Sequence, residues 1–547
     1  MSFLKYINKK SIEKLMNSKE FKNWLYSKRW FGDKSQLSNL KFKISIEFFK
    51  FLSENISLTI IKIIDSEYEK QYFLPLAYFK DKNEILDLSE NIFEITYTFI
   101  EENEKKSLSL VLLEAEFTNN FWNALFLNKD IYDNIPDLSI VYQNEDLKRK
   151  FSELSLNDID NYNIELEQLG KGNTTNLIFK FTISSKKMAF NSYVFKSYRG
   201  FSKNLEPSTL KILASNQFLG IPNLNAKIEF KNRTIISLMD YIQNEGNIGE
   251  VYWNEINDMI YTISTNQDKS NLDFDNNSFL QDLIENKCSD SFAITDDIYE
   301  FFKKFHEAMI LEDNDLYSSV VIEKDYFLRN FSQKLMLIIP EIIENKEKMP
   351  FFKVSEIESL FNKTSNRIQD ICSSIEKSEI RLQAIHQDLH MEQILYSRKG
   401  KSFLFHMTDL EGDPSFSTEE KKGKFPKERD IASFLRSFSY IKYNTLLGII
   451  IDKFSRKNYK ISEEILHDLF FTDKLENYKK ELNGLIKLLN IWETLHTERI
   501  IKNSEYDNKL INYFLIDRII HEINYEIKFR PFKVIIPLLG LKEYLNE

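Results

Sequence analysis

The feature that most constrains this chain is the stretch 384–414, AIHQDLHMEQILYSRKGKSFLFHMTDLEGDP. Strand patterns at 393–396 and 402–407 are separated by a turn signal at Arg398–Gly400, which predicts a β-hairpin. A hairpin brings Asp388, before its first strand, close to the acidic residues that follow its second strand. Carboxylates held close together are unfavourable unless a cation lies between them. The stretch therefore predicts a cation-dependent site.

This layout suits phosphoryl transfer, in which one Asp orients a hydroxyl group while an amide and a second Asp hold magnesium on the phosphates. Two other interpretations remain open for the separate halves. The pattern His386-x-Asp388-x-His390 could be half of a zinc site, although it lacks the helical i, i+4 pairing of familiar zinc motifs. Asp409, Glu411 and Asp413 could simply form a turn. The two halves together, in this order, favour the phosphotransferase.

Length and charge narrow the function class. The chain has 547 residues, which predicts two or three domains. Its net charge of -10 argues against a general nucleic-acid-binding protein, which needs a basic face. Cys288 and Cys372 are the only cysteines, too few for a disulfide framework. We find no signal-peptide pattern and no apolar run of about 18 residues, so the sequence predicts a cytoplasmic protein.

The N-terminal third has the pattern of a small β domain. A helix is expected over 18–30, ending at Gly32. Five β-branched and aromatic runs separated by polar turns then predict a meandering antiparallel sheet; they are 41–52, 56–65, 69–79, 91–99 and 109–117.

The next segment predicts a nucleotide-binding lobe. Residues 166–181 form a strand–turn–strand pattern in which Gly172, Asn173 and Thr174 could contact phosphates, although hairpins with two glycines are also common without a ligand. Lys196 lies on the following strand, where a cation would neutralise α- and β-phosphates. A further strand is predicted over 235–242. The family resemblance described next implies that this strand forms the hinge and that the backbone near Met239 and Tyr241 binds adenine.

The motifs HQDLHMEQIL, TDLEGDP and RDIASFLRSFSY, with RWFGDKS near the N-terminus and IPLLGL near the C-terminus, resemble the maltokinase family. That family consists of sugar kinases with an aminoglycoside-phosphotransferase-like, protein-kinase-like fold. The resemblance implies an α+β protein in three parts. They are an N-terminal cap (1–145), a mostly β nucleotide-binding lobe (146–245) and a helical lobe (246–547) that carries the catalytic loop and the acceptor pocket. Segments 265–297 and 312–380 are interpreted as insertions or extra helices.

The resemblance also implies residue roles. Asp388 would be the catalytic carboxylate, and Gln393 and Asp409 would bind Mg²⁺ with support from Glu411. Three positions depart from the family pattern: Gln387 and Glu392 replace glycines, and Ser208 stands where a helical Glu is expected to pair with Lys196. Glu206 is the candidate replacement for that Glu. His306, on a predicted helix at 299–309, is interpreted as a packing residue.

The acceptor pocket is predicted on the helix 515–530, where a polar face lies opposite an isoleucine stripe. Carboxylates, arginines and an aromatic ring suit a sugar, although such a face is more often simply solvated. The predicted sugar-binding residues, besides Asp388, are Arg436, Glu522, Tyr525, Glu526 and Arg530. On the same helix, Arg518 and Asp517 replace the family's Lys and Glu.

These resemblances imply ATP-dependent phosphorylation of the anomeric hydroxyl of maltose with Mg²⁺, linked to trehalose and α-glucan metabolism. Trehalose synthase would be a possible partner. Two alternatives remain open: a kinase for another sugar such as glucosamine or for an aminoglycoside, and a non-catalytic kinase-like partner of trehalose synthase. Arg518 and Arg530 argue against cationic acceptors.

Overall fold

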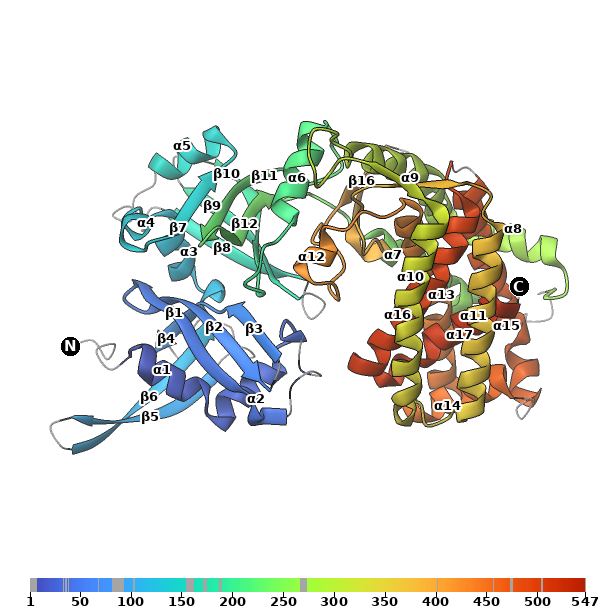
Figure 1. The fold of residues 1–547 in the computed structure, drawn as a ribbon, viewed down its shortest axis with the longest axis horizontal. Coiled ribbons are helices and arrows are strands. Elements are labelled where there is room, and N and C mark those ends of the chain that lie inside the picture. Colours follow the sequence, from blue (N-terminus) through green and yellow to red (C-terminus); the bar gives the residue numbers. More distant parts are fainter. Residues whose placement is uncertain are drawn as a thin grey trace. The chain divides into compact units, whose positions relative to one another are not determined.

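The computed structural model describes residues 7–32, 34, 37, 39–66, 68–80, 93–101, 104–153, 162–170, 175–185, 189–265, 273–400, 402–455, 457–472, 476–502 and 505–546. Strands dominate up to about residue 240 and helices dominate after it, as the colours of Figure 1 show. The predicted α+β class, with a mostly β part followed by a mostly α part, is confirmed. The chain divides into two compact units. The first unit comprises Met1–Lys211 and Pro222–Ile242, and the second comprises Ile212–Ile221 and Gln243–Glu547.

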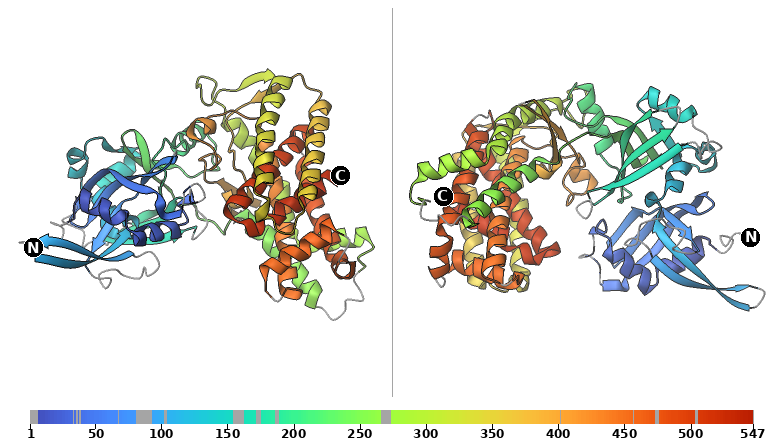
Figure 2. Two further views of the ribbon diagram at one scale, coloured as in Figure 1. Left: turned by 60° about the horizontal axis from the view of Figure 1, so that its bottom comes forward. Right: turned by 180° about the vertical axis from the view of Figure 1, so that it is seen from behind.

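The first unit begins with the predicted antiparallel sheet, whose strand order is β1-β2-β4-β6-β5 with β3 paired to β2. The third predicted run divides at Pro75 into two strands, because proline cannot donate to a ladder. The long β5–β6 hairpin extends beyond the rest of this sheet (Figures 1 and 2). The strands are β1 (Lys43–Ser53), β2 (Ile56–Asp65), β3 (Tyr68–Phe73), β4 (Leu76–Phe79), β5 (Phe93–Glu101) and β6 (Glu104–Glu114).

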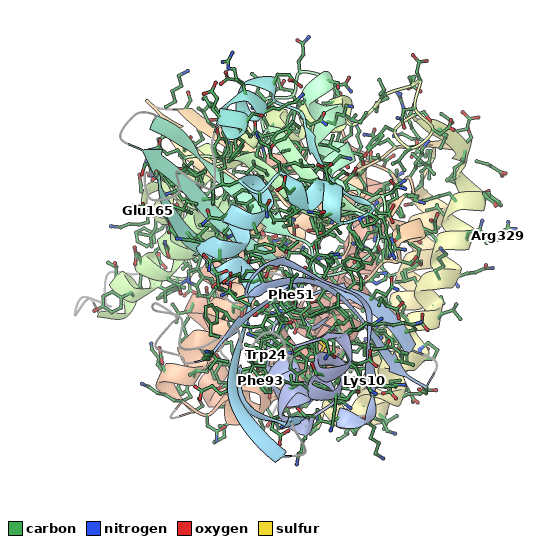
Figure 3. All side chains as sticks on the ribbon, turned by 90° about the vertical axis from the view of Figure 1, so that its left-hand side faces the viewer. Lys10, Trp24, Phe51, Phe93, Glu165 and Arg329 are labelled. Carbon is green, nitrogen blue, oxygen red and sulfur yellow. The ribbon has the colours of Figure 1, made fainter. Side chains whose placement is uncertain are left out.

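Helices α1 (Lys9–Met16) and α2 (Lys19–Ser27) precede this sheet. In its aromatic core, the rings of Trp24 on α2 and Phe93 on β5 lie 6.0 Å apart (Figure 3). The predicted helix over 18–30 is too long, since the backbone is already extended at Lys28. Lys28 and Trp30 instead direct their side chains to Glu114, at 2.8 and 2.7 Å. This buried contact, rather than Gly32, marks where the helix ends.

The second sheet of the first unit is also antiparallel, with the order β7-β11-β12-β10-β9-β8. Its first strand precedes residue 146 yet pairs with β11, so it belongs to this sheet by hydrogen bonding. The three-domain boundaries stay a prediction. The strands are β7 (Leu138–Tyr142), β8 (Tyr162–Leu169), β9 (Leu177–Ser185), β10 (Ala189–Ser197), β11 (Leu224–Phe230) and β12 (Arg233–Asp240). The neighbouring helices are α3 (Asn119–Phe126), α4 (Asp130–Asn134), α5 (Glu145–Glu153) and α6 (Glu206–Ser215).

A buried charge cluster ties the two sheets of this unit together. Arg199, just after β10, lies 2.8 Å from Glu114 and 2.6 Å from Glu116. Glu116 also accepts a hydrogen bond from Ser197, at 2.7 Å. Burial raises the pKa of Glu114, but the charges of Lys28 and Arg199 outweigh it and hold that pKa below its usual value. The cluster therefore depends on its cations staying in place.

The second unit contains a helical array and two pairs of antiparallel strands. β13 (Val320–Glu323) pairs with β14 (Glu379–Leu382), which follows α10 and α11 in the chain, and β15 (Ile394–Lys399) forms a hairpin with β16 (Ser402–Met407). The helix α16 packs against α10, α11, α13 and α17. The expected extra helices are present, since α10 and α11 lie within 312–380 and pack against each other (Figure 1).

The helices of this unit are α7 (Ile248–Thr265), α8 (Asn277–Lys287), α9 (Ser289–Ala308), α10 (Lys324–Glu344), α11 (Val354–Ser374), α12 (Thr418–Lys421), α13 (Glu428–Lys453), α14 (Tyr459–Phe471), α15 (Glu476–Lys502), α16 (Asn508–Phe529) and α17 (Ile535–Asn546). Within the described ranges, no helix combines the length and hydropathy that crossing a bilayer requires.

We predict that Arg199→Met destabilises the protein by about 3–5 kcal/mol, because it leaves buried carboxylates without their cation. Arg149→Met is the matched control, since Arg149 is an exposed residue paired with Asp146 at the surface. The control should change stability by less than about 0.5 kcal/mol. Urea unfolding of the three proteins measures the difference, and equal midpoints for the two variants would contradict the prediction.

Candidate active site

The predicted catalytic loop lies in the second unit, between β14 and the β15–β16 hairpin. The hairpin pairs as expected, with Ile394 opposite Met407. The Thr408 N–H donates to the Gln393 carbonyl at 2.9 Å, which closes the open end of the hairpin. The segment that follows Asp388 is thereby joined to the segment that carries Asp409.

The carboxylate of Asp430 on α13 fixes the backbone of the catalytic loop through hydrogen bonds. Asp430 is fully buried and accepts backbone hydrogen bonds from His386 at 2.8 Å and Gln387 at 2.9 Å. The same carboxylate lies 3.1 Å from His306 Nε2, and His306 Nδ1 lies 3.0 Å from the Tyr506 hydroxyl. Both ring nitrogens of His306 are thus engaged inside the unit, in agreement with its interpretation as a packing residue.

Gln387 and Glu392, which stand where glycines were expected, differ in backbone conformation. Gln387 has a φ of +72°, in the left-handed region that favours glycine, and tolerating a side chain there costs about 1–3 kcal/mol. Its amide offsets part of that strain, because it donates to the Lys421 carbonyl at 2.7 Å. Glu392 instead lies in a 3₁₀ turn (Met391–Gln393) with its side chain exposed. The loop therefore keeps a glycine-like backbone at only one of the two sites.

The carboxylate of Asp388 is paired with Arg518 of α16, whose Nη2 lies 3.0 Å from Oδ1. Burial raises the pKa of Asp388, but the Arg518 charge, followed by those of His390 and His386, outweighs it. The pKa of Asp388 consequently lies below its ordinary value. Asp388 is therefore an ionised hydrogen-bond acceptor at neutral pH.

The proposed metal ligands Gln393 and Asp409 are in contact. The Gln393 amide nitrogen donates to Asp409 Oδ2 at 3.1 Å, and a half-turn of that amide would present its oxygen instead. Glu411 lies two residues further along and is half-buried. Three or more His, Cys, Asp or Glu side chains do not converge on a metal position anywhere in the described part of the chain. Two oxygen donors in contact fit Mg²⁺, which usually takes few protein ligands besides water and phosphate oxygens.

The predicted acceptor residues form a chain of charges that starts at Asp388. Arg518 Nε donates to Glu522 Oε1 at 3.3 Å, and the other Glu522 oxygen accepts from Arg436 Nε at 2.8 Å. Arg436 is only 2% exposed, and its guanidinium packs against Gly540. A Cβ at Gly540 would lie 2.7 Å from Arg436 Nη1, so this position has no room for a larger residue.

The remaining predicted acceptor residues lie further along α16. Glu526 is fully buried and accepts hydrogen bonds from Tyr440 at 2.9 Å and from Arg530 at 2.6 and 2.9 Å. Tyr525 is 43% exposed, and its ring lies 4.7 Å from that of Phe529. Glu526 and Tyr525 are therefore not equivalent: the first is enclosed, whereas the second is open to solvent.

In the first unit, Lys196 on β10 is paired with Glu206, the first residue of α6. The Nζ–Oε2 distance is 2.9 Å, and both side chains are almost completely buried. The Tyr198 hydroxyl donates to the same carboxylate at 2.7 Å. Ser208, where the family has its Glu, is exposed and bonds back to the Leu205 carbonyl. The helix thus supplies the partner of Lys196 two residues before the expected position.

The structure describes only some of the other residues that are proposed to contact the nucleotide. Gly172, Asn173 and Thr174 lie outside the described residues. Met239 is buried on β12, opposite Val194 of β10. The Tyr241 N–H donates to the Ser192 carbonyl at 3.3 Å, so this amide is engaged within the sheet.

Two contacts, one in each unit, were not predicted from the sequence. The pairing of Tyr198 with Glu206 joins a residue just after the end of β10 to the first residue of α6, and no local sequence pattern indicates it. The contact of Arg518 with Asp388 links positions 130 residues apart, and only the charge of Arg518 on the polar face of α16 pointed to it.

No profile of a known protein family matches the sequence. Among solved structures, the chain is similar to a glucosamine kinase in complex with glucosamine, ADP and inorganic phosphate, with 10% identity, 96% of this chain and 98% of that chain covered, and a TM-score of 0.46. It is also similar to a thermostable mutant of an aminoglycoside phosphotransferase in its apo form, with 10% identity, coverage of 73% and 97%, and a TM-score of 0.33. A Plasmodium vivax ethanolamine kinase shows 13% identity, coverage of 69% and 88%, and a TM-score of 0.26. Because these TM-scores lie below 0.5, we base the function on this chain's own residues.

We predict that Arg518→Gln raises the pKa of Asp388, because burial then acts on the carboxylate without the opposing cation. A lowered native pKa stabilises the fold above the ordinary carboxyl pKa, and this stabilisation is lost as pH falls through the native value. In the variant that contribution should disappear at higher pH than in the wild type.

Carboxyl ¹³C NMR titration of Asp-labelled protein, with Asp388→Asn to assign the signal, measures this shift. Lys528→Gln removes a charge of the same sign from α16 that is paired with Glu341 instead, and it should leave the Asp388 titration unchanged. An unshifted Asp388 signal in Arg518→Gln would contradict the prediction.

Proposed function

We propose that this protein is an ATP-dependent sugar kinase that transfers a phosphoryl group to a sugar hydroxyl. The main support for the proposal is that the β15–β16 hairpin brings the segment of Asp388 and Gln393 next to the segment of Asp409. Asp430 fixes the backbone of the loop that carries Asp388. An ionised Asp388 accepts a hydrogen bond from the attacking hydroxyl and orients it. General-base assistance of this kind contributes about 10²–10⁴-fold to the rate.

Lys196, held by Glu206, is proposed to bind the nucleotide phosphates. A buried ammonium paired with a carboxylate keeps a fixed direction, and its N–H groups are donors of the kind that phosphate oxygens accept. Gly172, Asn173 and Thr174 are proposed to contribute phosphate contacts, and the backbone near Met239 and Tyr241 is proposed to contact adenine.

Gln393 and Asp409, with support from Glu411, would hold Mg²⁺, which neutralises phosphate charge during transfer when it is bound. Each of these residues offers an oxygen donor, as a hard cation requires. Glu522, Glu526, Tyr525 and Arg530 are proposed to bind the sugar, and Arg436 to hold Glu522 in place. A buried carboxylate that already bonds to an arginine keeps its orientation when hydroxyl groups arrive.

The finer proposal is maltose as the acceptor and its anomeric hydroxyl as the site of transfer, giving maltose 1-phosphate. It rests on the motif resemblance, and with it go a cytoplasmic location, a place in trehalose and α-glucan metabolism, and trehalose synthase as a possible partner. The direct test is incubation with Mg·ATP and a panel of sugars, with ³¹P NMR to identify the phosphorylated position. A protein that phosphorylates no sugar in the panel would refute the proposal.

Asp388→Asn should lower the rate of phosphoryl transfer by about 10²–10⁴-fold, because the amide cannot accept the proton. Nucleotide affinity should stay within about twofold in calorimetry, since Asp388 contacts the acceptor and not the nucleotide. Asp452→Asn, on the exposed surface of α13, is the matched control and should keep the wild-type rate. A normal rate in Asp388→Asn would remove this residue from its proposed role.

Glu206→Gln should lower transfer by about tenfold or more, which corresponds to about 1.4 kcal/mol, because Lys196 loses the charge that orients it. Nucleotide titration and kcat measurements follow the effect, with thermal unfolding as a check on folding. Adding Ser208→Glu to this variant tests the family position. Because Ser208 is exposed, the double variant should recover no activity. Recovery would place the functional partner of Lys196 at position 208.

A further inference from the structure

Arg518 lies beside Asp388, the residue that is proposed to bind the acceptor hydroxyl. Its side chain is 25% exposed and that of Asp388 is 17% exposed, so the pair is reachable from solvent although both groups are largely enclosed. Within the described ranges, Asp388 forms its ion pair with Arg518 through Oδ1. Oδ2 is then the oxygen that can receive the hydroxyl, with the guanidinium beside it.

The two carboxylates nearest this position are each paired with an arginine. Asp388 and Glu522 contribute two carboxylates, while Arg518 and Arg436 contribute two guanidinium groups. Each carboxylate is bonded to at least one of these arginines, at 3.0 Å for Asp388 and at 3.3 and 2.8 Å for Glu522. A cationic substrate would therefore have to compete with these arginines for Asp388 and Glu522.

A cationic group beside the reacting hydroxyl would be repelled by the positive charge of Arg518. An ammonium group on the neighbouring carbon would approach Arg518 within a few ångströms while the hydroxyl bonds to Asp388. Repulsion between like charges at such distances, in a partly buried site, exceeds the energy of a tenfold discrimination. A neutral hydroxyl in the same place can instead accept a hydrogen bond from the guanidinium.

We propose that Arg518 is a specificity-determining residue, which favours uncharged sugars and disfavours acceptors with an ammonium group next to the hydroxyl that is phosphorylated. This inference rests on the proposed kinase function and names the acceptor class of the same site. It differs from a purely positioning role, in which Arg518 would orient Asp388 and its loss would lower kcat equally for every acceptor.

The experiment compares glucose with glucosamine, which differ in a hydroxyl or an ammonium group next to the anomeric carbon. The wild type should show a kcat/KM for glucose at least about tenfold above that for glucosamine. Arg518→Gln should reduce this ratio by about tenfold or more, equivalent to about 1.4 kcal/mol. Arg518→Lys keeps the charge and should keep the ratio.

Lys509→Gln is the matched control, because Lys509 is a half-exposed cation of the same helix that is paired with Glu376. It should leave the ratio unchanged. A second measurement needs only the wild type: 2-deoxyglucose, which has neither group at that carbon, should react faster than glucosamine. This comparison tests the preferred acceptor class even if Arg518→Gln does not fold, and Arg518→Lys with glucosamine then tests the residue itself.

Three results are distinguishable. Equal losses for glucose and glucosamine in Arg518→Gln would reduce Arg518 to a positioning residue and overturn the inference. A wild type that prefers glucosamine over both neutral sugars would also overturn it, while leaving the kinase function intact. A folded wild type that binds nucleotide yet phosphorylates no sugar would refute the kinase function itself, and the specificity inference with it.

Discussion

The site depends on one buried carboxylate, that of Asp430. It has no solvent to stabilise its charge, so its stability comes from the donors around it, two of which are backbone N–H groups of the catalytic loop. The loop in turn cannot move without leaving that charge unsatisfied. Asp430 lies on α13, the helix that packs against α16, the helix of Arg518 and Glu522. The loop that carries Asp388 and the helix that carries its partner are thus set by the same packed pair of helices.

In both units, buried charged side chains are paired with side chains of opposite charge. Lys196 with Glu206, Arg199 with Glu114 and Glu116, and Arg436 with Glu522 are each enclosed and each paired in short contacts. Pairs of this kind add little net stability compared with apolar residues, but losing one partner is costly. They therefore act as constraints on geometry. In the first unit, Ser197 and Arg199 anchor the end of β10 to Glu116, directly after Lys196, the residue that carries the proposed phosphate contact.

Elements that depend on interactions between residues close in the sequence could be predicted, whereas contacts between residues far apart in the sequence could not. The β15–β16 hairpin and most of the sheet strands depend on alternation and turns over a few residues, and they are found close to where they were expected. The run 69–79 is instead divided at Pro75, and the run 109–117 leaves the strand after Glu114 for a 3₁₀ turn, Ala115–Phe117. The end of α2 was misplaced, because Lys28 leaves the helix to reach Glu114, 86 positions later. Ser208 and Glu206 lie on the same helical turn, and only the three-dimensional path of α6 shows which of them faces Lys196. The pairing of Asp388 with Arg518 is likewise set by helix packing, which no local pattern encodes.

The charged face of α16 shows why residue types alone leave the acceptor undecided. Glu522 and Glu526 were predicted as sugar ligands because carboxylates suit hydroxyl groups, yet the same carboxylates could bind an amine. Their partners separate these cases: Glu522 is shared by Arg518 and Arg436, and Glu526 is bonded to Arg530 and Tyr440. A carboxylate whose charge is already balanced has little attraction left for a cation, but its lone pairs can still accept from hydroxyl groups. The pairing of the acidic groups, more than their number, therefore favours a neutral polyol.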